Sequence, residues 1–246
     1  MLESIPISKV LFIDLETVSA TSTFNELDDR LKDHWRKKCR FILRAQPDEE
    51  LDDDRVALTF EGKAAIYSEF GKVICISVGY IHDKTRELRL KSFYGDDERE
   101  LLLEFTDLLN QHYADPGVHL ICGHNIREFD VPYLCRRMII HGIELPAVLK
   151  LAGKKPWETK HLIDTMELWK FGDIKNFTSL DLLAAVLQVD TPKDDIDGSQ
   201  VGSIYWKESD LGRIVSYCEK DVLTVAQILL RLKGHKLLTA QQIVSV

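Results

Sequence analysis

Short, nearly unbroken runs of apolar residues mark the places where the sequence predicts β-strands. Such runs are too short for most helices and suit strands that are covered on both faces. The predicted strands are 9–14, 70–81, 87–94, 118–122 and 161–163. Residues 82–85 favour a turn, so the second and third strands are expected to form an antiparallel hairpin.

Apolar residues that recur every three or four positions predict amphipathic helices between and after these strands. The predicted helices are 24–46, 97–112, 129–141, 179–187 and 209–233. For the last helix, Ser209 is the expected N-cap, and Gly234 follows the expected end.

The order of these elements predicts an α/β fold, with a mixed five-stranded sheet flanked by helices. We expect a single domain over residues 1–246, with a helical and acidic insert at about 19–69. Within the insert, six of the seven residues 48–54 are acidic. A run of like charges predicts a solvated loop or a poorly ordered link there.

The composition describes a soluble globular protein and excludes a disordered tail: 246 residues, 45% apolar and 29% charged, with a formal net charge of −8. This acidity argues against a surface covered with cations for duplex DNA or anionic membranes, but it leaves room for a local basic groove. Five widely spaced cysteines in mostly apolar surroundings predict reduced thiols. An N-terminus unlike a signal peptide, and apolar runs below the ~18–20 residues of a membrane span, predict a cytoplasmic protein without a membrane segment.

The first acidic motif is Asp14-Leu15-Glu16, at the end of the first predicted strand. Strand side chains alternate between the two faces, so the two carboxylates project to the same side and can share a metal ion. An isolated pair of this kind can equally be two solvated acids at a strand end.

The second motif is the segment 123–130, where a buried strand ends and a helix begins. Asp130 falls in the first turn of that helix, where a carboxylate also interacts favourably with the helix dipole. Asn125 in the same segment can simply cap the turn.

The third motif lies in the middle of the last predicted helix. Tyr217 and Asp221 are four residues apart and therefore share one face, which is otherwise apolar. A carboxylate that faces inward must be paired, hydrogen-bonded or bound to a cation. The alternative is a solvated acid at the edge of the helix.

Taken together, the motifs resemble those of the DEDD, or DnaQ-like, 3′–5′ exonucleases of the ribonuclease H-like fold. The family pattern has DxE at the end of the first strand, N-x(3)-F/Y-D, and either Y-x(3)-D or H-x(4)-D. Position 216 is Ser and position 217 is Tyr, so the resemblance is to the tyrosine (DEDDy) branch. It extends from residue 9 to about residue 232, and it is closest to predicted exonucleases related to the proofreading domain of family-B DNA polymerases. Segments 70–73, 197–199 and 214–218 carry that closer likeness.

The resemblance implies a site for two Mg²⁺ or Mn²⁺ ions, bound by Asp14, Glu16, Asp130 and Asp221. Asp14 would bridge the ions, Asp221 would lie near the nucleophile, and Tyr217 would orient the attacking water. Hard divalent cations prefer oxygen ligands, so carboxylates suffice without His or Cys.

Four further residues near the acids are expected to contact the terminal nucleotide. Asn125 would do so by a hydrogen bond and Phe129 by stacking, although Phe129 can also be a core aromatic. Leu15 and Thr17 flank the acids and are expected to pack on the last base or donate to it.

The function that follows is a metal-dependent 3′–5′ exonuclease that acts on the 3′ ends of single-stranded DNA or RNA, with DNA favoured, and releases nucleoside 5′-monophosphates. A polymerase or repair factor would be a partner in trans. The alternatives are a non-catalytic module of the same fold that binds nucleic acid or a polymerase, and an integrase-like endonuclease, which the Tyr217–Asp221 pair does not favour.

The net charge fits this interpretation once it is divided along the chain. Six negative charges lie in residues 48–54, outside the expected site, and without them the chain carries −2. Two divalent ions would bring that remainder to +2. We therefore expect metal-dependent binding of nucleic acid without the steep salt dependence of a protein with many phosphate contacts.

Overall fold

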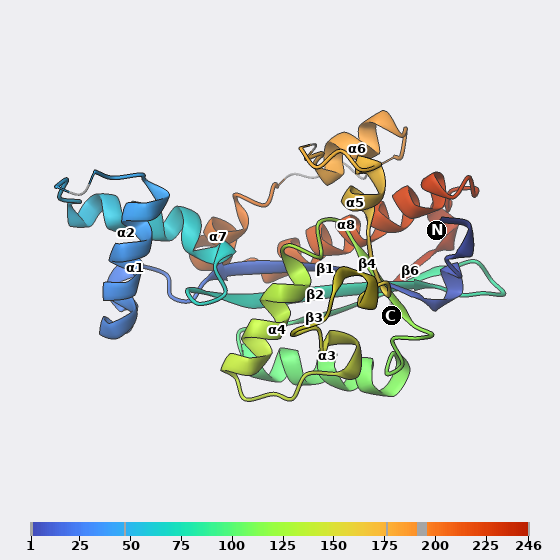
Figure 1. Ribbon diagram of the computed structural model, residues 1–246, viewed down its shortest axis with the longest axis horizontal. Helices are drawn as coiled ribbons and strands as arrows, with labels where there is room; N and C mark the ends of the chain where they lie inside the picture. Colours follow the sequence, from blue (N-terminus) through green and yellow to red (C-terminus); the bar gives the residue numbers. More distant parts are fainter. Residues whose placement is uncertain (1, 47, 176, 191–195, 246) are drawn as a thin grey trace.

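The computed structural model describes residues 2–46, 48–175, 177–190 and 196–245. At its centre, these residues form a mixed six-stranded sheet (Figure 1). The strands are β1 (Val10–Ser19), β2 (Gly71–Ile81), β3 (Leu88–Tyr94), β4 (Leu120–Gly123), β5 (Leu162–Asp164) and β6 (Ile243–Ser245), in the order β5-β4-β1-β2-β3-β6. β1–β2 and β2–β3 are antiparallel, whereas β1–β4, β4–β5 and β3–β6 are parallel.

The predicted α/β fold, with a mixed sheet and a β2–β3 hairpin, is confirmed. The sheet has one strand more than expected, because β6 adds three residues to the outer edge of β3. β6 follows a polar segment and is too short to produce a clear alternation of apolar and polar residues.

Helices cover both faces of the sheet, which explains the unbroken apolar runs of its central strands. On one face, α3 (Glu98–His112) and α4 (Asp130–Ile140) pack on Leu11 and Ile13 of β1. On the other face, α8 (Leu211–Leu232) packs on Val10 and Phe12. Two shorter helices, α5 (Thr165–Lys170) and α6 (Leu180–Val186), lie on the same side as α8 (Figure 1). None of the described helices is both long and apolar enough to cross a membrane.

The segment between β1 and β2 lies beyond one end of the sheet (Figure 1). It contains α1 (Asp29–Ile42) and α2 (Asp53–Lys63), and their apolar faces enclose a separate cluster around Trp35 and Phe60. The helix predicted over 24–46 is therefore shorter, because Asp28 caps α1 and residues 24–26 form a separate 3₁₀ turn.

The acidic run 48–54 is not the continuous loop that was expected. Asp52 caps α2 by accepting a hydrogen bond from the Arg55 amide, and Asp53 and Asp54 occupy the first turn of that helix. Acids are stabilising there because the N-terminus of a helix carries a partial positive charge.

A tight junction joins this segment to the sheet. The carbonyl oxygen of Ala65 accepts hydrogen bonds from the Thr17 hydroxyl of β1, at 3.0 Å, and from the Tyr133 hydroxyl of α4, at 2.9 Å. A Cβ atom on Gly71 would lie 2.3 Å from that Tyr133 hydroxyl oxygen and 2.8 Å from the carbonyl oxygen of Val18. Only a residue without a side chain fits at this point.

The start of the last helix differs from the prediction. Asp210 is the N-cap of α8, and its carboxylate accepts from the Arg213 amide. Ser209, the expected cap, has a left-handed backbone (φ 54°) and ends a one-turn π-helix, Ile204–Glu208, that follows α7 (Val201–Ser203). The predicted end is confirmed: α8 stops at Leu232, and Gly234 adopts a left-handed conformation.

Candidate active site

β1 contributes Asp14 and Glu16 on the face that α8 covers. They share that face with Phe12, in keeping with the alternation of side chains along a strand. Glu16 is buried, with 8% of its surface exposed, and Asp14 is half-buried. A β-bulge follows between Glu16 and Thr17, so the strand changes its pairing with β2 just beyond the two acids.

α4 contributes Asp130, its first residue, which is buried. The carboxylate accepts hydrogen bonds from the backbone amides of Leu15 and of Asp130 itself. The N-terminus of α4 thus lies against β1 between the residues that bear the other two acids. A carboxylate in this place also interacts favourably with the helix dipole.

The loop that leads to Asp130 is held by Asp164, at the end of β5. Its carboxylate accepts from the amides of Asn125, at 2.9 Å, and Arg127, at 3.2 Å. The same carboxylate caps α5 through the Met166 amide, at 3.0 Å. Asp164 therefore positions the loop and starts a helix, and it contributes negative charge close to Asp130.

α8 contributes Tyr217 and Asp221, one turn apart on the side that faces β1. The Tyr217 hydroxyl is hydrogen-bonded to Asp221. Burial, together with the charges of Asp221, Glu16 and Asp14, raises the pKa of Tyr217 far above its usual value of 10. The phenol therefore stays protonated at physiological pH and can donate a hydrogen bond.

Asp221 is close enough to the other three acids to raise the pKa of each of them. Burial raises the pKa of Asp14 well above its ordinary value, and Asp221, Glu16 and Asp130 raise it further. Burial and the charges of Asp221 and Asp130 do the same to Glu16. The pKa of Asp130 is raised to about 7, mainly by burial. Without cations, neighbouring carboxylates of this kind retain protons at neutral pH.

One of the five cysteines, whose apolar surroundings predict only a reduced thiol, also belongs to this cluster. Cys218 lies next to Tyr217 on α8, and its Sγ is 3.4 Å from both the carbonyl oxygen and Oδ2 of Asp14. Asp14, Glu16 and Cys218 each place a ligand atom within 4.8 Å of the other two. The signal in the sequence is the spacing of three between Cys218 and Asp221, which puts both on one helix face.

The donor set fits hard divalent cations. Carboxylate oxygens dominate it, and the raised pKa values mark a site where several negative charges gather with little water. Asp14, Glu16, Asp130 and Asp221 are the residues that could hold Mg²⁺ or Mn²⁺.

The four expected substrate contacts lie in different environments. Leu15 packs in the core under α4, and the Thr17 hydroxyl donates to Ala65, so both side chains face away from Asp14 and Glu16. Phe129 is partly buried against the core and 5.5 Å from the Tyr133 ring, between ring centroids. Asn125 has a left-handed backbone (φ 63°), and its Oδ1 is buried without a hydrogen-bond partner among the described residues. A buried polar atom without a partner is costly in a folded protein and is a candidate for a ligand contact.

Comparisons with known proteins place this geometry in a family context. A family model described as a predicted 3′–5′ exonuclease related to the exonuclease domain of PolB matches residues 66–242, which include Asp130, Tyr217 and Asp221. The family B DNA polymerase from the hyperthermophilic archaeon Pyrobaculum calidifontis is similar in structure, with 20% sequence identity and a TM-score of 0.50. That likeness covers 92% of this chain and 25% of the polymerase chain, so the chain spans about a quarter of the polymerase's length. No curated protein matches the chain.

Proposed function

Because the chain belongs to the family of predicted 3′–5′ exonucleases related to the exonuclease domain of PolB, we propose that it hydrolyses single-stranded nucleic acid from the 3′ end. Each cleavage would release a nucleoside 5′-monophosphate. DNA is the favoured substrate because the family is related to a polymerase exonuclease domain and the structural neighbour is a DNA polymerase. The expected membership in the predicted exonucleases related to the exonuclease domain of PolB is thereby confirmed.

The observation that carries the proposal is the convergence of four acids from three elements. The charge of Asp221 on α8 raises the pKa of Asp14 and Glu16 on β1 and of Asp130 on α4, so the four acids lie within electrostatic reach. The most economical reason to gather four acids in a half-buried place is to bind cations.

In the proposed mechanism, Asp14, Glu16, Asp130 and Asp221 would hold the cations, with Asp221 as the ligand near the nucleophile. When bound, Mg²⁺ or Mn²⁺ would acidify the attacking water and stabilise charge on the phosphoryl group and the leaving oxygen.

Tyr217 orients the attacking water, because its hydroxyl is protonated and hydrogen-bonded to Asp221. The water oxygen forms a bond to the terminal phosphorus, and the bond from phosphorus to the 3′ oxygen of the preceding nucleotide breaks. One proton of the water ends on that 3′ oxygen, so the shortened strand again ends in a 3′ hydroxyl. The Asn125 side chain is the proposed contact to the terminal nucleotide, with Phe129 beside it.

The test uses matched single-stranded DNA and RNA labelled at the 3′ end, with Mg²⁺ or Mn²⁺ present. We expect release of labelled monophosphate by the wild type, and loss of this activity in Asp14→Asn. Asp83→Asn, an exposed acid in the β2–β3 turn, is the matched control. Equal activity of Asp14→Asn and wild type would overturn the site, and binding without hydrolysis in every condition would favour the non-catalytic module. Association with a polymerase or repair factor in trans belongs to the same proposal.

A further inference from the structure

The most basic part of this acidic chain lies in α1 and the turn after it. Residues 30–46 contain seven Lys and Arg residues and one acid, whereas the whole chain carries −8. The family match begins at residue 66, so this basic segment lies outside it. A concentration of positive charge in an acidic protein is typical of a surface that binds a polyanion.

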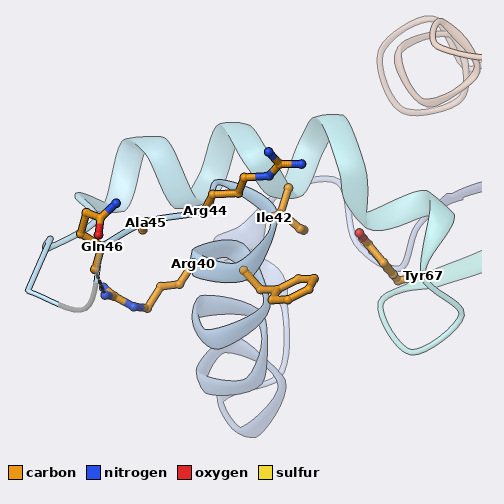
Figure 2. Close-up of a pocket in the computed structure, with 7 residues that line it drawn as sticks. Arg40, Ile42, Arg44, Ala45, Gln46 and Tyr67 are labelled. Carbon is orange, nitrogen blue, oxygen red and sulfur yellow. Dashed lines mark hydrogen bonds between the residues drawn. The ribbon is translucent and has the colours of Figure 1, made fainter.

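The end of α1 forms a groove of about 630 Å³ that combines cations with aromatic rings (Figure 2). We call it the α1 groove; its lining residues are Arg40, Phe41, Ile42, Arg44, Ala45, Gln46 and Tyr67. Phe41 is 80% exposed, which is unusual for a large aromatic residue. Exposed aromatic rings beside cations are the features that bind the bases and phosphates of a single strand.

The structure of the α1 groove is organised by contacts within the segment. The Arg40 guanidinium donates to the carbonyl oxygens of Gln46 and Glu49 and thereby fixes the turn after α1. The ammonium of Lys38 lies 4.1 Å from the centroid of the Tyr67 ring, and that ring also packs edge-on against Trp35. The groove is therefore held in one shape before any ligand binds.

The acidic run 48–54 leaves part of the positive charge uncompensated. Asp53 pairs with Arg36, and Glu49 pairs with Arg55 of α2. Within the described part of the chain, Arg44 and Lys37 form no ion pair, and both are exposed. Arg44 has a left-handed backbone (φ 52°) at the point where the chain turns away from α1.

The α1 groove lies beyond the C-terminal end of β1, the strand that carries Asp14 and Glu16 in its middle rather than at its end, because β1 continues to Ser19. Tyr67 follows the 3₁₀ turn Ala64–Ile66, and the Ala65 carbonyl is bonded to Thr17, the residue after Glu16. In Figure 1, α1 and α2 extend past the same end of the sheet. A nucleic-acid strand that enters the active site would therefore meet a basic and aromatic surface on this side of the protein.

We infer that the α1 groove binds single-stranded DNA upstream of the 3′ terminus, an inference that rests on the proposed function. Arg44 in the groove contacts a phosphate, as does Lys37, which lies beside the groove one helical turn before Phe41 on α1. Bases stack on Phe41 and Tyr67. Stacking and phosphate contacts tolerate any sequence, as an exonuclease that moves along a strand requires.

The test measures the affinity for fluorescently labelled single-stranded DNA of about 30 nucleotides by fluorescence anisotropy. EDTA is present so that no hydrolysis occurs. We expect about tenfold weaker binding for both Phe41→Leu and Arg44→Ala. Phe41→Trp keeps the stacking surface and should bind like the wild type. Arg99→Ala, an exposed arginine on α3, is the control and should change nothing. Arg44→Ala should also lower the slope of log affinity against log salt by about 1.

Two results would overturn the inference: wild-type affinity in both Phe41→Leu and Arg44→Ala, or tighter binding of polyglutamate than of DNA. Failure of the proposed function gives a different result. If the wild type releases no monophosphate but both groove variants lose DNA binding, the exonuclease proposal fails and the α1 groove stands. If all variants degrade and bind long strands like the wild type, the groove fails and the exonuclease proposal stands.

Discussion

The thiol of Cys218 donates to the Oδ2 of Asp14, at a distance of 3.4 Å, and so places a sulfur atom beside Asp14 and Glu16. This hydrogen bond lowers the pKa of Asp14, although burial and the other acids raise it by more. Cys218→Ala removes the donor, and we expect about tenfold weaker Mn²⁺ binding at neutral pH, measured by calorimetry. Cys218→Ser retains a donor and should bind Mn²⁺ nearly as well as the wild type.

The control for this prediction is Cys135→Ala, since the Cys135 thiol donates to the Leu149 carbonyl away from the site. Equal Mn²⁺ affinity in Cys218→Ala and the wild type would contradict a role for the thiol in preparing Asp14 for metal.

The stability of the metal-free protein should fall as the pH rises from about 4 to 7. The pKa of Asp130 is about 7 in the folded protein and near its ordinary value of 3.8 in the unfolded chain. Between these values, the folded protein holds a proton that the unfolded chain has lost, so the free energy of unfolding decreases with pH. Asp14 and Glu16 act in the same direction.

Asp130→Asn isolates this contribution, because its amide oxygen can still accept from the Leu15 backbone. In EDTA at pH 7.5, we expect the variant to be more stable than the wild type, by on the order of 1 kcal/mol or more. The gain should disappear at pH 4. Saturating Mg²⁺ should stabilise the wild type, by about 2.7 kcal/mol at a hundred times the Kd, and the variant less. Chemical denaturation of both proteins is measured in each of these three conditions, and a pH-independent difference in stability would refute the explanation.

Tyr217→Phe should lower kcat by about tenfold to a hundredfold and leave metal affinity unchanged. The reason is that the hydroxyl positions the attacking water but is not needed to hold the cations. The pKa of Tyr217 is raised far above 10. The pH–rate profiles of the wild type and Tyr217→Phe should therefore have the same shape near pH 10. A limb near that pH that disappears in Tyr217→Phe would show that the phenol ionises during catalysis.

The ion pair between Glu98 and Arg137 should contribute strongly to stability. Glu98 accepts from Arg137, from His141 at 2.7 Å and from the Val73 amide at 2.7 Å, which joins α3, α4 and β2. Burial raises the pKa of Glu98, but Arg137 and the hydrogen bonds outweigh it, so the pKa lies below its ordinary value of 4.5. Arg137→Leu would leave a buried charge without its partner, and we expect a loss of about 3–5 kcal/mol.

The double variant Glu98→Leu/Arg137→Leu removes both charges and should be more stable than Arg137→Leu alone. Urea denaturation of the two single variants and the double variant completes the cycle. Additive losses would mean that the pair is not energetically coupled.

Most of the sheet was predictable from the sequence, because β1 to β4 are long enough or apolar enough to be recognised as strands. It did not predict β6, or the start of α8, where Ser209 and Asp210 are both good caps and only the left-handed backbone of Ser209 distinguishes them. Spacing paired Asp14 with Glu16 and Tyr217 with Asp221, since alternation along β1 and the repeat of α8 determine which side chains share a face. The set of four acids, with Asp130, came from the family resemblance. Cys218 and the α1 groove were missed because a cysteine in an apolar run looks like core, and because the groove depends on tertiary contacts of Tyr67. The single domain and the cytoplasmic location stay predictions.

Through the hydrogen bond from the Leu15 amide to Asp130, β1 contributes to the site in two ways. It provides the side chains of Asp14 and Glu16, and it provides one backbone amide. The main chain of β1 therefore fixes the position of the Asp130 carboxylate relative to Asp14 and Glu16. Another apolar residue of similar size at position 15 would keep this amide donor. Proline is the exception, since it has no amide hydrogen to donate.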